Sequence, residues 1–269
     1  MFDVDKFKYT LQTSWLAHEF IYLEDTASTN TYLRTLSSER LCHGVVCLAD
    51  NQTRGRGQYD RKWISEPFSN LTFTIGFKPY KANNIHLLAL SCSLAVLETV
   101  QNAVDKKAFL KWPNDILCDN RKISGMLAES VFKGNRIERF LVGIGINVNQ
   151  LEFPESIKDS TTSLADLLNG KTLCRERLLA ELLQRVEFYY YRWSKQKTKL
   201  IRAINKHIIG YGNWVQLKCD GELLPETHKI LGVNEQGHLL ALSESDNVKK
   251  ITHEQIRIVS PGQTDIQPI

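Results

Sequence analysis

The feature that most constrains the fold is a series of short β segments, separated by turn signals, that follows one long helical pattern. Residues 84–104 carry apolar side chains at helical spacing, beginning with Ile85 and Leu88. The segments that follow are short, apolar or alternating, and bounded by polar turns; they cover residues 108–112, 116–119, 123–131 and 136–149. A β-meander that follows a helix predicts an α+β fold.

The rest of the first two hundred residues adds further helices and strands. The expected elements are a helix over 26–36, a buried strand over 44–50, a half-buried strand over 70–77, and helices over 163–170 and 174–195. Ser28 or Thr29 can cap the first of these helices. The last helix presents Leu178, Leu182 and Val186 on its inner face. The first twenty residues carry few structural signals.

From about residue 212 the pattern changes to five short β segments with tight turns between them. Such a series in under sixty residues is typical of a small β-barrel. The sequence therefore predicts two domains, a larger one over 1–211 and a small barrel over 212–269.

Composition narrows the class of protein. The net charge is +4 and 24% of residues are charged, which is ordinary for a globular protein. No apolar run approaches the roughly 20 residues that cross a bilayer, and the first residues lack the apolar core of a signal peptide. We therefore expect a cytoplasmic protein. The six cysteines are scattered without zinc-ligand spacing and are expected to be reduced.

One segment is strongly basic. Residues 171–206 hold ten lysines and arginines: Lys171, Arg175, Arg177, Arg185, Arg192, Lys195, Lys197, Lys199, Arg202 and Lys206. A solvated helix face explains such a run, and a docking surface for an acidic partner is the alternative.

A glycine-rich basic loop follows the predicted strand over 44–50. Two glycines, Gly55 and Gly57, flank Arg56, so the backbone can approach a ligand and present N–H groups to an anion. Four cations occur within nine residues: Arg54, Arg56, Arg61 and Lys62. The loop matches neither a Walker A motif nor a dinucleotide fingerprint. It predicts a phosphate-handling site, with a basic surface turn as the alternative.

Two further stretches carry chemistry. Asn114 and Asp115 follow a Lys-Trp-Pro sequence at a strand end and offer the hard oxygen ligands that Mg²⁺ prefers, although a simple turn has the same composition. Lys122 enters an apolar strand, where an unpaired ammonium group is costly, so it is expected to meet an anion. Gly125 leaves room for a ligand beside that strand. Residues 143–147 also alternate glycine, apolar and polar residues, as they would on the floor of a pocket.

Together these stretches resemble the biotin–protein ligase family, in their order and spacing. The shared features are the Ser-Thr-Asn triplet at 28–30, the Gly-Arg-Gly loop before Trp63, Lys-Trp-Pro-Asn-Asp at 111–115, Lys-x-x-Gly at 122–125 and Gly-x-Gly-x-Asn at 143–147. The resemblance is strong over residues 25–150. It implies a central mixed β-sheet flanked by helices and a C-terminal domain like an SH3 barrel. It also implies the formation of biotinyl-5′-AMP from biotin and ATP with Mg²⁺, and biotin transfer to a lysine of a biotin carboxyl carrier protein.

The resemblance also implies roles for individual residues. Arg56 and Lys122 are expected to be catalytic. The implied biotin-binding residues are Ser28, Thr29, Asn30, Gln52, Gly55, Arg56, Gly57, Gln58, Lys122, Gly125 and Gly143. The implied ATP-binding residues are Arg54, Arg56, Trp63, Asn114, Asp115, Lys122 and Asn147, and Asp115 is the implied ligand of Mg²⁺. We expect no membrane partner, and relatives that are monomers as well as homodimers leave the oligomeric state open.

Two departures from the family pattern matter. Some members carry a second arginine two residues beyond the loop arginine, where this chain has Gln58. Bifunctional members place a winged-helix DNA-binding domain of about sixty residues ahead of the Ser-Thr-Asn helix, whereas twenty-seven residues precede Ser28 here. The sequence therefore predicts a ligase without DNA binding. The alternatives are a lipoate or octanoate transferase of the same superfamily, and a sensor that binds biotin or a nucleotide without catalysis.

Overall fold

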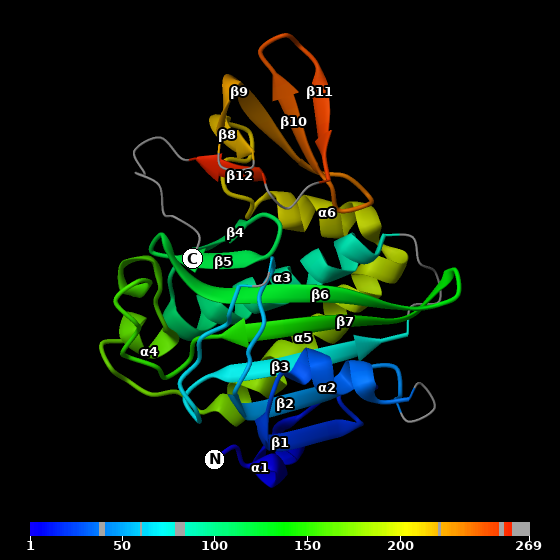
Figure 1. Ribbon diagram of the computed structural model, residues 1–269, viewed down its shortest axis with the longest axis vertical. Helices are drawn as coiled ribbons and strands as arrows, with labels where there is room; N and C mark the ends of the chain where they lie inside the picture. Colours follow the sequence, from blue (N-terminus) through cyan, green and yellow to red (C-terminus); the bar gives the residue numbers. More distant parts are fainter. Residues whose placement is uncertain (38–40, 60, 79–83, 220–221, 253–255, 260–269) are drawn as a thin grey trace.

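The computed structural model describes residues 1–37, 41–59, 61–78, 84–219, 222–252 and 256–259. It contains a seven-stranded sheet in the order β1-β2-β3-β7-β6-β5-β4 and a five-stranded sheet at the C-terminal end (Figure 1). In the larger sheet, β1 (Phe20–Thr26) pairs parallel with β2 (Val45–Gln52), and the remaining neighbours pair antiparallel. The sheet is therefore mixed, and the predicted α+β fold is confirmed.

The other strands of the larger sheet are β3 (Leu71–Phe77), β4 (Ala108–Lys111), β5 (Asp115–Cys118), β6 (Arg121–Lys133) and β7 (Arg136–Ile146). The helices are α1 (Val4–Thr10), α2 (Thr29–Thr35), α3 (Ile85–Val104), α4 (Leu164–Leu167), α5 (Arg175–Lys195) and α6 (Lys197–Asn205). Sequence analysis missed α1, β1 and α6. The N-cap of α1, Asp3, accepts a hydrogen bond from the backbone N–H of Lys6 at 2.9 Å and is a recognisable helix start.

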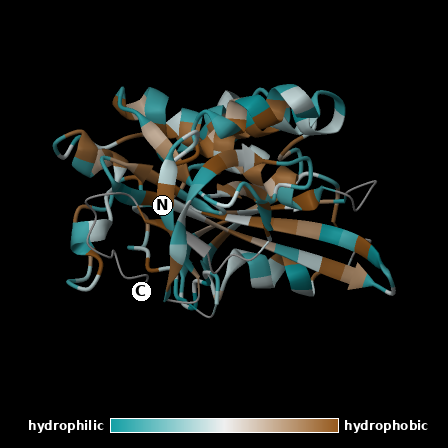
Figure 2. Cartoon of the chain, turned by 90° about the horizontal axis from the view of Figure 1, so that it is seen from above, coloured by the Kyte–Doolittle hydropathy of each residue, from teal (hydrophilic) through white to brown (hydrophobic). Residues whose placement is uncertain are grey.

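Helices cover both faces of the seven-stranded sheet (Figure 2), and β2 shows why. Val46 and Leu48 belong to the main core, which includes α3 and α5, whereas Val45 and Cys47 pack with Leu33 of α2 on the opposite face. All eight residues of β2 are buried or half-buried because both faces of the strand are covered. The sheet is therefore the middle layer of three.

One expectation for β3 was wrong. The alternation of Leu71, Phe73, Ile75 and Phe77 was interpreted as a strand with one solvated face, but every residue of β3 is buried. These apolar side chains join the main core. The intervening Thr72 and Thr74 lie on the other face, where Thr74 contacts residues of α2. The polar face of this strand is directed into the protein.

Helix α3 is the central helix of the main core. Its 20 residues are long and apolar enough to cross a membrane by length and composition, in contrast to the expectation that no apolar run approaches that length. However, 72% of its most apolar window is buried inside the fold. Residues such as Leu88, Cys92 and Val96 are fully buried there. The burial explains the composition of α3 as that of a core helix.

The five-stranded sheet consists of β8 (Trp214–Cys219), β9 (Glu222–Val233), β10 (Leu239–Ser243), β11 (Val248–Ile251) and β12 (Ile256–Val259), all antiparallel. It lies against the rest of the chain through specific contacts. The indole N–H of Trp112 donates to the carbonyl oxygen of Gly237 at 3.2 Å, and Asn205 accepts from the backbone N–H of Val233 at 2.8 Å. The division into domains at residue 212 stays a prediction.

The basic segment over 171–206 forms parts of α5 and α6, and one of its ten cations is not solvated. Arg175 is 6% exposed and forms an ion pair of 2.7 Å with the fully buried carboxylate of Asp50. The same carboxylate accepts from the hydroxyl of Tyr22, and burial together with this contact raises the pKa of that tyrosine to about 12. Arg175 therefore fastens α5 to β2 rather than forming part of a surface.

Candidate active site

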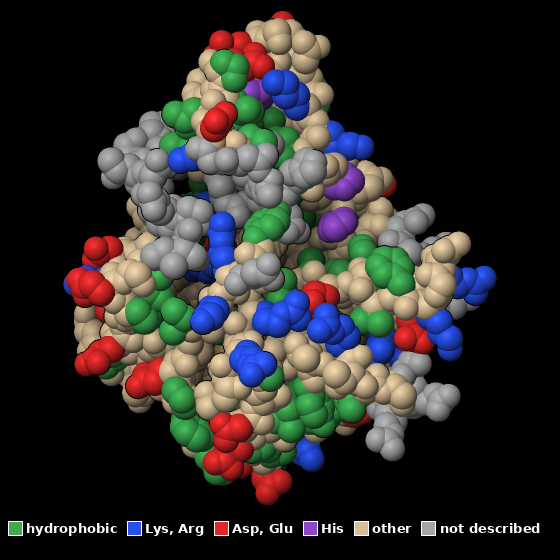
Figure 3. Space-filling model, viewed as in Figure 1, with side chains coloured by type: hydrophobic (Ala, Val, Ile, Leu, Met, Phe, Trp, Pro, Cys, Tyr) green, Lys and Arg blue, Asp and Glu red, His purple; other side chains and the backbone are tan. Residues whose placement is uncertain are grey.

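A cavity of about 430 Å³ lies over β3, β6 and β7, beside the loop that follows β2. Lysine and arginine side chains gather on the central part of this face of the molecule (Figure 3). The predicted site residues that line the cavity are Ser28, Thr29, Asn30, Gln52, Arg56, Gly57, Gln58, Trp63, Asn114, Asp115, Lys122, Gly125, Gly143 and Asn147. The fold therefore brings together residues from five separate stretches of sequence.

Two of the predicted site residues, Arg54 and Gly55, do not line the cavity. Arg54 is exposed and does not line the cavity. Gly55 is buried beneath the loop, where its carbonyl oxygen accepts from the backbone N–H of Trp63 at 3.0 Å. A Cβ atom at Gly55 would lie 2.5 Å from the carbonyl oxygen of Trp63. Gly55 thus shapes the loop, and it contacts no part of the cavity directly.

One end of the cavity is polar but uncharged. The backbone N–H of Thr29, in the first turn of α2, donates to the side-chain oxygen of Gln52 at 2.8 Å. Asn30 is 3% exposed, and its side-chain oxygen accepts from the hydroxyl of Thr74 at 2.5 Å. Ser28 precedes the helix without using its hydroxyl to cap it. Hydroxyl and amide groups at the end of a slot suit a neutral ligand with several hydrogen-bonding atoms.

Gly143 makes this polar end possible. A Cβ atom there would lie 2.2 Å from the side-chain oxygen of Asn30, which is closer than any two such atoms approach. Glycine on β7 therefore allows α2 to press its first turn against the sheet. The resemblance assigned Gly143 to the wall of the biotin pocket, and the structure gives the physical reason for glycine at that position.

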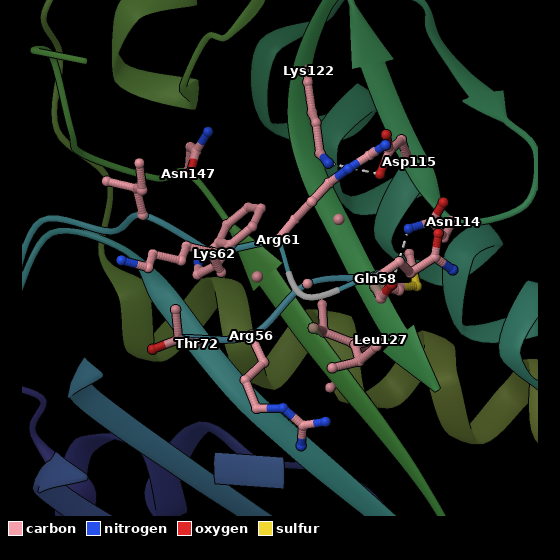
Figure 4. A pocket seen from close by; sticks show the side chains of 18 of the residues that line it. Arg56, Gln58, Arg61, Lys62, Thr72, Asn114, Asp115, Lys122, Leu127 and Asn147 are labelled. Carbon is pink, nitrogen blue, oxygen red and sulfur yellow. Dashed lines mark hydrogen bonds and ion pairs between the residues drawn. The ribbon is translucent and has the colours of Figure 1, made fainter. Parts of the chain in front are cut away.

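The other end of the cavity is cationic. Lys122 reaches across from β6 and forms an ion pair of 2.8 Å with Asp115 at the start of β5. The expectation that Lys122 meets an anion is met here by a carboxylate of the protein itself. In Figure 4, Lys122 points at Asp115, while Arg56 lies at the opposite side of the view. Arg61, Lys62 and Lys111 also line the cavity.

Arg56 is held by a residue that sequence analysis did not select. Its guanidinium group donates to both carboxylate oxygens of Glu129, at 2.8 and 3.2 Å. This two-point contact fixes the plane of the guanidinium group as well as its position. Glu129 lies four residues beyond Gly125 on β6, so its position on the strand near the Lys-x-x-Gly motif was the available signal.

Trp63 lies on the floor of the cavity against the glycines of the neighbouring strands. A Cβ atom at Gly145 would lie 2.3 Å from its indole ring, and one at Gly125 would lie 3.3 Å from it. The ammonium group of Lys122 is 5.9 Å from the ring centroid. The indole N–H is buried with no hydrogen-bond partner among the described residues. Gly145 belongs to the stretch that was expected to form the floor of a pocket, although no role of its own was assigned to it; the spacing of two from Gly143 places both glycines on the same face of β7.

Two asparagines complete the cationic end. The amide nitrogen of Asn114 donates to the carbonyl oxygen of Met126 at 3.1 Å, and that of Asn147 donates to the carbonyl oxygen of Thr162 at 3.0 Å. The side-chain oxygen of Asn147 is buried and has no partner within the part of the chain that the structure describes. A buried acceptor without a partner is costly, so this oxygen is available to a ligand donor.

One wall of the cavity was not predicted at all. Phe153, Ile157, Ser160 and Thr161 line it from the segment between β7 and α4, which is irregular apart from the short 3-10 helix Lys158–Ser160. Thr162 donates its backbone N–H to the carbonyl oxygen of Lys122 at 2.9 Å and so joins this segment to β6. Irregular segments lack periodicity, and their place in space follows from tertiary contacts.

The cysteines are remote from this chemistry. None lines the cavity among the described residues. Burial raises the pKa of Cys47 and that of Cys92 to about 12, which keeps both thiols protonated and unreactive. No cluster of three histidine, cysteine or acidic residues that could hold a metal occurs within the described ranges. Five lysines and arginines line the cavity, and the acidic side chain among its described lining residues, Asp115, is paired with Lys122, so the cavity has the character of an anion-binding site.

The chain is similar in sequence to known proteins. The sequence matches the biotin/lipoate A/B protein ligase family over residues 22–147. A biotin–[acetyl-CoA-carboxylase] ligase of Mycobacterium tuberculosis is 30% identical over 227 residues, which cover 80% of this chain and 79% of that protein. The bifunctional ligase/repressor BirA of Bacillus subtilis is 28% identical over 256 residues, which cover 93% of this chain and 77% of that protein.

The chain is similar to solved structures as well. The biotin protein ligase of Aquifex aeolicus, in complex with biotin and ATP, superposes with a TM-score of 0.77 and 32% identity; the match covers 90% of this chain and 99% of that one. The biotin protein ligase of Leishmania major has the same fold, with a TM-score of 0.61 at 24% identity. The chain belongs to the biotin–protein ligase family.

Proposed function

We propose that this chain joins biotin to ATP as biotinyl-5′-AMP and then transfers the biotin to a lysine of a biotin carboxyl carrier domain. The observation that carries the proposal is a single cavity with an uncharged polar end and a cationic end. A cyclic urea needs the first end, and a carboxylate with a triphosphate needs the second. The relative from Aquifex aeolicus, which superposes over 90% of this chain, binds biotin and ATP.

In the first step, an oxygen of the biotin carboxylate attacks the α-phosphorus of ATP, and the bond from that phosphorus to pyrophosphate breaks. Lys122 and Arg56 line the cavity from opposite sides, and each offers N–H donors to the negative groups of the substrates. Cations fixed in advance stabilise the charge that grows in such a transition state. Each must exchange its carboxylate partner, Asp115 or Glu129, for the substrate.

In the second step, the neutral amine of the acceptor lysine attacks the carbonyl carbon of the mixed anhydride. AMP leaves and the amine releases a proton, so no nucleophile of the protein is needed. Trp63 and the Gly-Arg-Gly loop would shield the anhydride from water, which is the competing nucleophile. The N–H of Trp63 and the side-chain oxygen of Asn147, which have no hydrogen-bond partner among the residues that the structure describes, are available to the nucleotide.

The oxygens of this site fit a magnesium ion that is carried in by ATP. Asp115 offers a carboxylate that is partly open to the cavity, and Asn114 adjoins it. Magnesium bound to nucleotides commonly uses one or two carboxylates and keeps several waters. Asp115 would hold the ion, which neutralises phosphate charge when it is bound.

Purified protein, biotin and ATP test the proposal. We expect pyrophosphate release that depends on biotin, and covalent labelling when an isolated biotin carboxyl carrier domain is added. Lipoic acid and octanoic acid serve as controls, because their ring or chain offers no partners to the hydroxyls and amides of the polar end. Equal activity with lipoic acid, or pyrophosphate release with no transfer to any carrier, would refute the proposed substrate and acceptor.

A further inference from the structure

Glu129 stands behind the polar end of the cavity and does not line it. Its side chain is 18% exposed and contacts two residues of the site. It accepts two hydrogen bonds from Arg56, as described above. It also accepts one from the side-chain nitrogen of Asn30 at 2.8 Å. Arg34 lies 3.6 Å from the same carboxylate at the surface.

The carboxylate of Glu129 determines which way the amide of Asn30 faces. A carboxylate only accepts hydrogen bonds, so the NH₂ group of Asn30 must point toward it. The carbonyl oxygen of Leu127 lies 3.2 Å from the same nitrogen and requires the same orientation. The oxygen of Asn30 must then face Thr74, whose hydroxyl is 2.5 Å away. Glu129 thereby makes Asn30 an acceptor toward Thr74.

The direction of the next hydrogen bond follows. A hydroxyl has one proton, and that of Thr74 is used on the oxygen of Asn30. The hydroxyls of Thr74 and Thr29 are 2.7 Å apart, and the hydroxyl of Thr29 also lies 3.2 Å from the side-chain oxygen of Gln52. With the proton of Thr74 on Asn30, the proton of Thr29 completes the shorter of these two contacts. The hydroxyl of Thr29 then presents lone pairs to the cavity. Gln52 uses its oxygen on the backbone N–H of Thr29, and its NH₂ group is left as a donor.

We propose that Glu129 is a positioning residue that sets the hydrogen-bond direction along Asn30, Thr74 and Thr29, and so makes the polar end specific for a cyclic urea. This inference rests on the proposed function and deepens it. An acceptor at Thr29 beside a donor at Gln52 matches the adjacent N–H and C=O of a urea. Reversal of the chain would turn Thr29 into a donor, which would face the N–H of the ligand and repel it.

Glu129→Gln and Thr74→Val break this chain at two separate points. Glutamine can donate as well as accept, so only the carbonyl oxygen of Leu127 still requires the orientation of Asn30. Valine has the shape of threonine but no hydroxyl proton. Each substitution is expected to weaken the binding of biotin about tenfold, the usual effect of one misdirected buried hydrogen bond. The double variant is expected to bind biotin no worse than the weaker-binding of the two single variants, because both substitutions interrupt the same series of hydrogen bonds.

The measurement is the dissociation constant for biotin, by titration calorimetry of the full chain without ATP. Arg34→Gln is the matched control, because it removes an exposed cation from the same carboxylate and should leave the constant within about twofold. Thr74→Ser is the second control. It keeps the hydroxyl and should bind biotin far better than Thr74→Val. If Glu129→Gln fails to fold, this comparison still tests whether the hydroxyl proton of Thr74 has the role that the proposal requires.

Two results overturn the role of Glu129. The first is multiplicative loss of affinity in the double variant, which means that the two residues act independently. The second is equal binding by the serine and valine variants of Thr74, which means that the hydroxyl proton has no role. If wild-type protein does not bind biotin at all, the proposed function itself is refuted, and this outcome is distinct from both.

Discussion

Replacement of Lys122 by methionine should separate catalysis from stability. Methionine keeps most of the length of the side chain and removes the charge. The ion pair of Lys122 with Asp115 is 2.8 Å long, but the two side chains are 36% and 22% exposed. A pair this open to water contributes at most about 1 kcal/mol to the free energy of unfolding. For a chain of this size, the melting temperature should fall by about 2–4 °C.

The effect on the reaction should be much larger. Loss of one charged donor to a developing negative charge commonly lowers kcat by roughly 10²–10³-fold. The assay is single-turnover release of pyrophosphate with saturating biotin and ATP, beside thermal unfolding of the same sample. Lys106→Met is the matched control, since Lys106 forms an ion pair of 2.6 Å with Asp119 at the same end of the sheet but outside the cavity.

Lys106→Met should show a similar small change in melting temperature and retain full activity. The reasoning would be refuted if Lys122→Met kept its rate within about threefold of wild type, far short of the loss expected for a transition-state contact. It would also be refuted if the two lysine variants lost activity equally, since the effect would then come from general stability.

Two further predictions concern the nucleotide end and the attachment of the N-terminal segment. In Gly145→Ala, the added Cβ would lie 2.3 Å from the ring of Trp63 and displace it, so the KM for ATP should rise by about five- to tenfold, the value of one aromatic contact; indole emission that matches wild type would contradict this. Burial raises the pKa of Glu187, but three backbone N–H groups donate to its carboxylate and lower the pKa overall. Its stabilisation should therefore be complete above the unfolded pKa of about 4.3 and disappear as pH falls through the folded value. The difference in unfolding free energy between wild type and Glu187→Gln should accordingly vanish in acid, and a constant difference down to low pH would show that the carboxylate charge has no part in it.

Local patterns were sufficient for most helices and strands. The spacing of apolar residues located β2, β3, α3 and α5. Each of these elements buries a continuous apolar face, and a buried face requires apolar residues at regular positions in the sequence. The same patterns did not tell whether the second face of β3 meets water or protein. The threonines of that face look like solvent-facing residues in sequence, and only the packing of α2 shows that they are internal.

Charged residues show the limit of sequence analysis more sharply. Arg175 belongs to a basic run and resembles a surface residue, yet it pairs with Asp50, which is 125 positions away in the sequence. Glu129 gave no motif of its own, and its contacts with Asn30 and Arg56 join three separate segments. The sign of a charged side chain can be read from the sequence, but the residue with which it pairs depends on which strands and helices become neighbours.

The helix followed by a β-meander, and the glycine-rich basic loop with Lys122 and Asp115, were determined by the sequence itself. Spacing and residue type encode local backbone conformation and the kind of atoms that a site can offer. The tertiary structure alone decided that α2 and β7 meet at Gly143, that Trp63 rests on Gly145, and that one carboxylate orients the polar end of the cavity. These contacts join residues far apart in the chain, and their energies depend on distances and directions that no local pattern contains.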